Sequence, residues 1–104
     1  MFVTVDQVDD QPSARLEDAH NFKQFYVLAR IYDRAILADS LAAASIGRLE
    51  GEYVWVERSW LERQGPAEDG WRTGLESMLA YATSKGWVSD DGHAIRAHVE
   101  QGWP

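Results

Sequence analysis

The sequence lacks cysteine and long apolar runs, and each absence excludes a class of protein. Without cysteine there is no disulfide, no thiolate nucleophile and no cysteine-based zinc or iron–sulfur site. No apolar run approaches the roughly 20 residues that a membrane-spanning helix needs. The residues after Met1 soon reach Asp6, Asp9 and Asp10 and do not resemble the basic region and apolar core of a signal peptide, so we expect none. We therefore expect a cytoplasmic protein that binds no membrane and no structural metal.

Clusters of basic residues are also missing. The chain has 10 Lys and Arg residues against 17 Asp and Glu residues, a net charge of -7, and its cations are scattered along the sequence. Nucleic acids bind to clustered Lys and Arg side chains. We therefore expect no nucleic-acid partner. The charge permits an acidic inhibitor that imitates nucleic acid, but no motif indicates one.

Known catalytic and cofactor motifs are absent as well. The sequence has no glycine-rich dinucleotide fingerprint, no phosphate-binding loop, no nucleophile elbow and no His-Glu-x-x-His pair. His93 and His98 are five residues apart, which puts them on opposite faces of a strand, where they cannot easily share a metal ion. We therefore expect no cofactor and no metal, and any catalytic residue is unknown.

The residues that are present are typical of a packed domain. Hydrophobic residues make up 45% of the 104 positions and aromatic residues 12%. We expect one small α+β domain over residues 1–104, with a three- to four-stranded sheet and helices packed mainly on one face. Strands are expected at 2–8, 22–32, 53–56 and 94–99, and helices at 14–19, 34–45, 59–64 and 70–85.

Two of these segments have an alternative. Residues 1–12 form either an edge strand or a loose arm. In residues 22–32, Phe25, Val27 and Ala29 alternate as in a strand, but the segment also fits one face of a helix. We favour a strand because aromatic and β-branched residues prefer that conformation.

Capping residues indicate where the helices begin and end. N-terminal caps are expected at Asp33, Ser59 and Asp69. Gly47 is a stop signal for the helix at 34–45, and Gly86 is expected to end the helix at 70–85 in a left-handed conformation. The latter helix has the clearest apolar stripe, which we expect to face the core: Trp71, Leu75, Met78, Leu79 and Ala82.

The large number of aromatic rings is the unusual feature of the composition. A chain of 11.8 kDa cannot enclose all of these rings, so part of the aromatic area is expected at the surface. The tryptophans are Trp55, Trp60, Trp71, Trp87 and Trp103. We therefore expect a protein-interaction module that acts as a homodimer through exposed aromatic surface, because symmetric dimers are the commonest oligomers.

An alternative function places a small ligand at two strands. Tyr53 and Trp55 share one face of their strand and form the candidate wall of a ligand-binding pocket. Arg96, His98 and Glu100 alternate along the last strand, which gives a polar row whose members are about 7 Å apart. These five residues are the candidate ligand-binding site of a small-molecule-binding protein or enzyme. The simpler interpretation of the polar row, a solvated strand face, is the one we favour.

Overall fold

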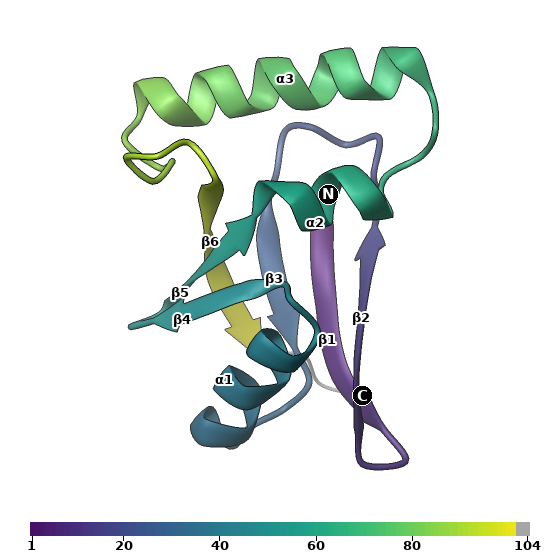
Figure 1. Ribbon diagram of the computed structural model, residues 1–104, viewed down its shortest axis with the longest axis vertical. Helices are drawn as coiled ribbons and strands as arrows, with labels where there is room; N and C mark the ends of the chain where they lie inside the picture. The colour runs from purple at the N-terminus through teal and green to yellow at the C-terminus, as the bar shows by residue number, and fades with distance from the viewer. Residues whose placement is uncertain (102–104) are drawn as a thin grey trace.

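The computed structural model describes residues 1–101, which form a six-stranded sheet and three helices (Figure 1). The strands are β1 (Phe2–Val8), β2 (Gln11–Glu17), β3 (Tyr26–Ala29), β4 (Gly47–Glu50), β5 (Tyr53–Glu57) and β6 (Ala94–Gln101). The helices are α1 (Arg34–Ala43), α2 (Arg58–Gln64) and α3 (Asp69–Ser84). The α+β class expected from the sequence is confirmed, but the expected three to four strands are too few. None of the helices in the described residues is long and apolar enough to cross a membrane.

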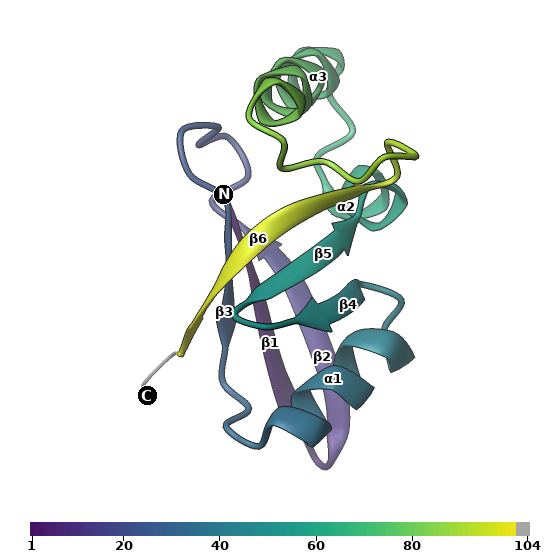
Figure 2. The ribbon, with the colours of Figure 1, turned by 90° about the vertical axis from the view of Figure 1, so that its left-hand side faces the viewer.

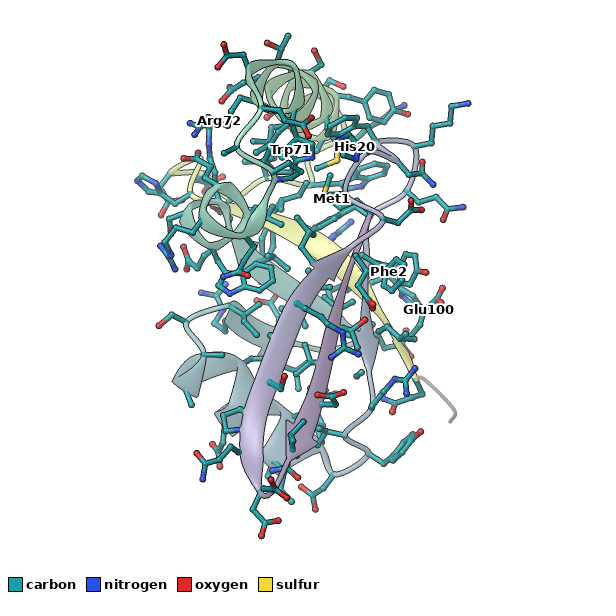
Figure 3. The ribbon with its side chains drawn as sticks, turned by 90° about the vertical axis from the view of Figure 1, so that its right-hand side faces the viewer. Met1, Phe2, His20, Trp71, Arg72 and Glu100 are labelled. Atoms are coloured by element: carbon teal, nitrogen blue, oxygen red, sulfur yellow. The ribbon has the colours of Figure 1, made fainter. Side chains whose placement is uncertain are left out.

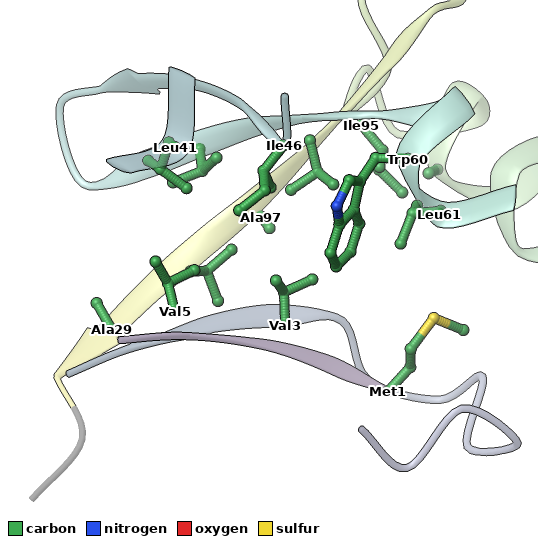
Figure 4. Packing of buried hydrophobic residues seen from close by; sticks show 14 of the residues in the cluster. Met1, Val3, Val5, Ala29, Leu41, Ile46, Trp60, Leu61, Ile95 and Ala97 are labelled. Carbon is green, nitrogen blue, oxygen red and sulfur yellow. The ribbon is translucent and has the colours of Figure 1, made fainter. Parts of the chain in front are cut away.

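The strand order is β2-β1-β3-β6-β5-β4. The three central strands β1, β3 and β6 are parallel, and the outer pairs are antiparallel. The sheet curls, so that β1 and β3 face β4 and β5 across the core (Figure 4). Helix α1 contacts β2 and β4, and helix α2 contacts β2 and β5. The two helices therefore fill the opening between the two edges of the curled sheet (Figure 2).

The core lies inside this curl. Val3 and Val5 of β1 and Val54 and Val56 of β5 are fully buried, and Trp60 of α2 inserts between the two halves of the sheet (Figure 4). Because successive side chains of a strand point to opposite faces, the residues between these valines point away from the core. The sheet therefore has a second, convex face, which we call the outer face.

The helix expected at 14–19 is wrong, because these residues belong to strand β2 and the loop after it. Asp9 and Asp10 both adopt positive φ angles, 52° and 63°, and make a two-residue hairpin turn between β1 and β2. Asp tolerates this left-handed conformation better than most residues. With the turn at this point, residues 11–17 continue as a strand paired with β1. Strand β1 is consequently an inner strand, neither a loose arm nor an edge.

The strand expected at 22–32 is much shorter than the pattern indicated. Only Tyr26–Ala29 pairs with neighbours, as β3 between β1 and β6. The preceding residues form a loop that is held from both sides. The Met1 amine donates to the Asn21 carbonyl (2.7 Å), and the Trp71 Nε1–H donates to the Ala19 carbonyl (2.8 Å). Burial lowers the pKa of the Met1 amine, although Asp18 opposes the effect.

Strand β4 has no counterpart among the expected elements, and the role expected for Gly47 is wrong. Helix α1 ends at Ala43, and Ser45 takes the positive φ angle, 56°, that reverses the chain. Gly47 instead begins β4, where a Cβ atom would lie 1.8 Å from the Trp55 carbonyl oxygen. Glycine is needed here because the two strands of the β4–β5 hairpin approach closely.

The expected caps have mixed outcomes. Asp33 caps α1, since its side chain accepts the Ile36 N–H (3.0 Å), and Gly86 adopts a φ of 76° after α3. Ser59 and Asp69 are wrong as caps, because α2 begins at Arg58 and α3 at Asp69, so both residues lie inside their helices. Their caps are Glu57 and Glu68, and neither side chain makes a capping hydrogen bond.

Helix α3 turns its expected apolar stripe to the core. Trp71, Leu75, Leu79 and Ala82 are buried, and Met78 packs partly buried against the same cluster. Polar side chains connect α3 to α2 on the outside: Arg58 bonds Glu62 (2.7 Å) within α2 and also Glu76 of α3. The hydrogen bond to Glu62 raises the pKa of Arg58 above its ordinary value.

The close approach at Gly47 gives a test of the hairpin. We expect Gly47→Ala to lower the free energy of unfolding by more than about 2 kcal/mol, because the methyl group and the Trp55 carbonyl cannot share this space. Chemical denaturation measures the change. Gly70→Ala is the control: no atom lies within 4 Å of its added Cβ, so we expect a neutral or slightly stabilising effect. Equal effects of the two substitutions would contradict the placement of β4.

The packing of α3 gives a second test. Leu75 is fully buried, so we expect Leu75→Ala to cost about 2–5 kcal/mol through lost contacts and a cavity. Ser77→Ala, on the exposed side of the same helix, should change stability by less than about 0.5 kcal/mol. Urea melts of both variants provide the comparison, and a negligible loss for Leu75→Ala would show that α3 is not packed as described.

Candidate functional site

The outer face carries the residues that the sequence indicated as a candidate ligand site. In β6, Arg96, His98 and Glu100 alternate with the buried Ile95 and Ala97, so all three point outward. In β5, Tyr53 and Trp55 alternate with buried valines in the same way. The register pairs Tyr53 with His98 and Trp55 with Arg96. All five residues therefore share one face, and their role in binding stays a prediction.

Close contacts join some of these five side chains and not others. The Arg96 guanidinium carbon lies 4.5 Å from the centre of the Tyr53 ring, and the edge of Tyr53 meets the His98 ring at 6.0 Å between centroids. Trp55 turns instead to the sheet edge, where its Nε1–H donates to Glu50 (3.2 Å). Glu100 lies farther along β6, opposite Leu28 of β3.

Two further rings, which the sequence did not indicate, extend this arrangement across the sheet. The register pairs Tyr26 of β3 with His98, and Phe2 of β1 with Tyr26. Phe2 and Tyr26 stack with 5.0 Å between centroids and 9° between ring planes. Phe2, Tyr26, His98 and Tyr53 therefore form a continuous line over four strands, which we call the ring row. Figure 3 shows Phe2 and Glu100 on the same side of the sheet, with Met1 directed instead toward Trp71.

The outer face is open. Helices α1 and α2 lie on the other side of the sheet and α3 above it, and in Figure 2 the curved face of β3 and β6 on the left carries no helix of the described chain. His98 and Tyr53 are exposed, and Arg96 is half-buried. His98 and Glu100 of the polar row are open to water, whereas Arg96 packs against the Tyr53 ring. The solvated strand face of the simpler sequence interpretation therefore describes only part of the row.

A groove adjoins one end of the ring row, where α3 ends and β6 begins. Two hollows of about 250 and 120 Å³ share the side chains of Phe25, Trp87 and Arg96. The larger hollow includes Tyr53 and His98, and the smaller one includes Lys23 and Tyr81. We call the two hollows together the aromatic groove. Of the five expected site residues, it contains Tyr53, Arg96 and His98, but not Trp55 or Glu100.

Sequence reasoning missed Phe25, Lys23 and Trp87 as groove residues. Trp87 was named as one of the five tryptophans, and in the structure its ring meets Tyr81 of α3 edge-on, with 6.0 Å between centroids. Its proximity to Arg96 depends on the pairing of residue 88 with residue 95. A pairing of this kind has no signature in the local sequence.

A larger cleft, of about 380 Å³, lies beside α1 and shares His98 with the aromatic groove. Its cation is already engaged, because the Arg34 guanidinium donates to the Gly51 carbonyl (2.7 Å), and Glu52 adds a carboxylate to the lining. This cleft therefore has less unbalanced charge than the aromatic groove. No group of three or more His, Asp or Glu side chains in residues 1–101 is placed to hold a metal ion.

Comparisons with known proteins give no match, whether with protein-family models, with curated proteins or with solved structures. We therefore infer a function from the geometry of the outer face and of the aromatic groove.

The turn that leads into β6 offers a pH test of how this strand is held. Asp91 Oδ1 accepts hydrogen bonds from the Ser89 hydroxyl (2.6 Å) and the His93 N–H (2.9 Å), and these bonds lower the pKa of Asp91 below its ordinary value of 3.8. A depressed carboxyl pKa stabilises the fold above the unfolded value, and the stabilisation is lost as the pH falls through the folded value.

We expect Asp91→Asn to lower the melting temperature slightly at pH 7. The difference from the original protein should shrink as the pH falls from about 3.8 through the lower pKa of the folded Asp91, because the carboxyl of the original protein then also becomes neutral. Melting curves recorded by circular dichroism between pH 2.5 and 7 measure this. A difference that stays constant over this range would mean that the charge of Asp91 does not support the turn.

Proposed function

We propose that this chain is a protein-interaction module that forms a homodimer by packing its outer face against a second copy. The observation that supports the proposal is the ring row, in which Phe2, Tyr26, His98 and Tyr53 cross four neighbouring strands. Tyr53 and His98 are exposed, Phe2 and Tyr26 are half-buried, and no helix lies over this face of β3 and β6 in Figure 2. Contiguous aromatic surface on a folded domain is typical of interaction sites.

The charges beside the ring row make the outer face complementary to itself. The ring row runs across the strands. A two-fold axis that lies along this row, between the two copies, therefore reverses the strand direction and places β6 of one copy antiparallel over β6 of the other. Arg96 and Glu100 stand two residues to either side of His98. The rotation therefore brings Arg96 over Glu100 of the second copy, and the reverse. A symmetric interface makes each contact twice, so two ion pairs flank the rings.

The size of this surface predicts a weak dimer. Strands are about 4.8 Å apart and rise about 3.3 Å per residue, so the four strands of the ring row present a surface of a few hundred Å². A standard stable interface buries roughly 800 Å² on each partner. We therefore expect association at micromolar concentrations, in the range of transient complexes, with the two sheets aligned to within about 30°.

The alternative function is a small-molecule-binding protein or enzyme with Tyr53 and Trp55 as the pocket wall and the polar row as its polar groups. Catalysis at the polar row has less support from this geometry. His98 and Glu100 are exposed, and water around them keeps the local dielectric constant high. A catalytic site needs enclosure to strengthen such charges. The cytoplasmic location expected from the sequence also stays a prediction.

A charge exchange tests the dimer. Light scattering over a concentration series should show a mass that rises from 11.8 kDa toward twice that value. Arg96→Glu and Glu100→Arg should each raise the dissociation constant at least about ten-fold, because each places like charges together twice. The double variant restores opposite charges, so it should recover most of the association.

Arg63→Glu is the control, because it reverses an exposed cation on α2, away from the outer face. We expect it to leave the dissociation constant unchanged. A mass that stays at 11.8 kDa up to millimolar concentration would overturn the proposal. A dimer that is insensitive to both single charge reversals would place the interface elsewhere.

A further inference from the structure

The aromatic groove has a charge opposite to that of the protein as a whole. The chain has a net charge of -7, yet Lys23 and Arg96 line the groove, and none of the described residues that line it is Asp or Glu. A third cation stands at its rim, where the Lys85 ammonium lies 5.6 Å from the centre of the Tyr81 ring. The groove therefore attracts an anion, although most of the protein surface repels one.

Flat aromatic surface accompanies these cations. Trp87 is 38% exposed and Tyr81 is 58% exposed, and Phe25 lies half-buried between the two hollows. Ring faces bind planar aromatic groups by stacking and edge contacts. A ligand that satisfies both the rings and the cations has an aromatic plane with a negative group at one end.

The backbone holds the main ring of the groove in place before any ligand arrives. The Trp87 N–H donates to the Ala82 carbonyl (2.9 Å), which completes the C-terminal cap of α3. The Trp87 carbonyl accepts the Arg96 N–H (2.7 Å) from β6. Both polar backbone groups of Trp87 are thus bonded, and a groove that is ordered in advance loses less entropy on binding.

We propose that the aromatic groove binds a small planar aromatic anion, with its ring against Trp87 and Phe25 and its carboxylate between Lys23 and Arg96. The two hollows together just exceed the lower limit of about 300 Å³ that is usual for ligand sites. This volume suits one or two fused rings. The proposal does not depend on dimer formation, although Arg96 borders both surfaces.

Calorimetric titration with 2-naphthoate tests the proposal, and 2-naphthylmethylamine is the matched ligand with the same ring and the opposite charge. We expect 2-naphthoate to bind at least about ten-fold more tightly than the amine. Lys23→Glu should remove this preference by reversing one cation of the groove. Trp87→Ala should weaken binding of both ligands, because it removes the ring surface that they share.

Two control variants match these substitutions. Arg48→Glu reverses an exposed cation on β4, outside the groove, and Phe2→Ala removes a ring of the ring row that does not line the groove. Both should bind 2-naphthoate as the original protein does. Melting curves check that Trp87→Ala is folded, and Lys23→Glu, in an exposed loop, provides an independent test if it is not.

Equal binding of the two ligands, or unchanged 2-naphthoate binding in both groove variants, would overturn the proposal. Binding of an acidic peptide without binding of 2-naphthoate would also overturn it, in favour of a protein partner. Glu100→Arg separates this site from the dimer, because the substitution should weaken self-association and leave 2-naphthoate binding intact.

Discussion

The structure depends on the backbone pairing of β6 with two neighbours at once. On one side β6 is parallel to β3, and on the other side it is antiparallel to β5. Without β6 the sheet would fall into two parts, one built from β1, β2 and β3 and the other from the β4–β5 hairpin. Strand β6, the last described strand, thus joins two parts of the sheet whose strands all precede it in the sequence. The core between these parts is complete only when β6 has paired with both.

The same pairing places the candidate functional residues. His98 lies between Tyr26 and Tyr53 because β6 lies between β3 and β5. The Arg96 guanidinium packs on the ring of Tyr53 from β5, and Arg96 also lines the aromatic groove with Trp87, which precedes β6 in the chain. The aromatic groove and the ring row therefore meet at one strand.

Local patterns predicted some features of the site and missed others for a physical reason. The alternation of Arg96, His98 and Glu100 placed them on one strand face, and Tyr53 and Trp55 were assigned together in the same way. Such alternation follows from the geometry of a single strand. Strand alternation cannot predict the other groove residues, Phe25, Lys23 and Trp87. Their proximity to Arg96 requires contacts between a loop, the end of a helix and the start of another strand.

The sequence by itself determined the α+β class, the apolar stripe of α3, the cap at Asp33 and the left-handed residue at Gly86, because each depends on residues close together in the chain. Only the tertiary structure decided that residues 11–17 are a strand, since the turn at Asp9 and Asp10 is selected by pairing with β1. It also decided the β4–β5 hairpin, because Gly47 acts through its contact with Trp55 and resembles a helix stop in the sequence. The order of the strands, and with it the position of His98 among the rings, depends on contacts between residues far apart, which no local pattern encodes.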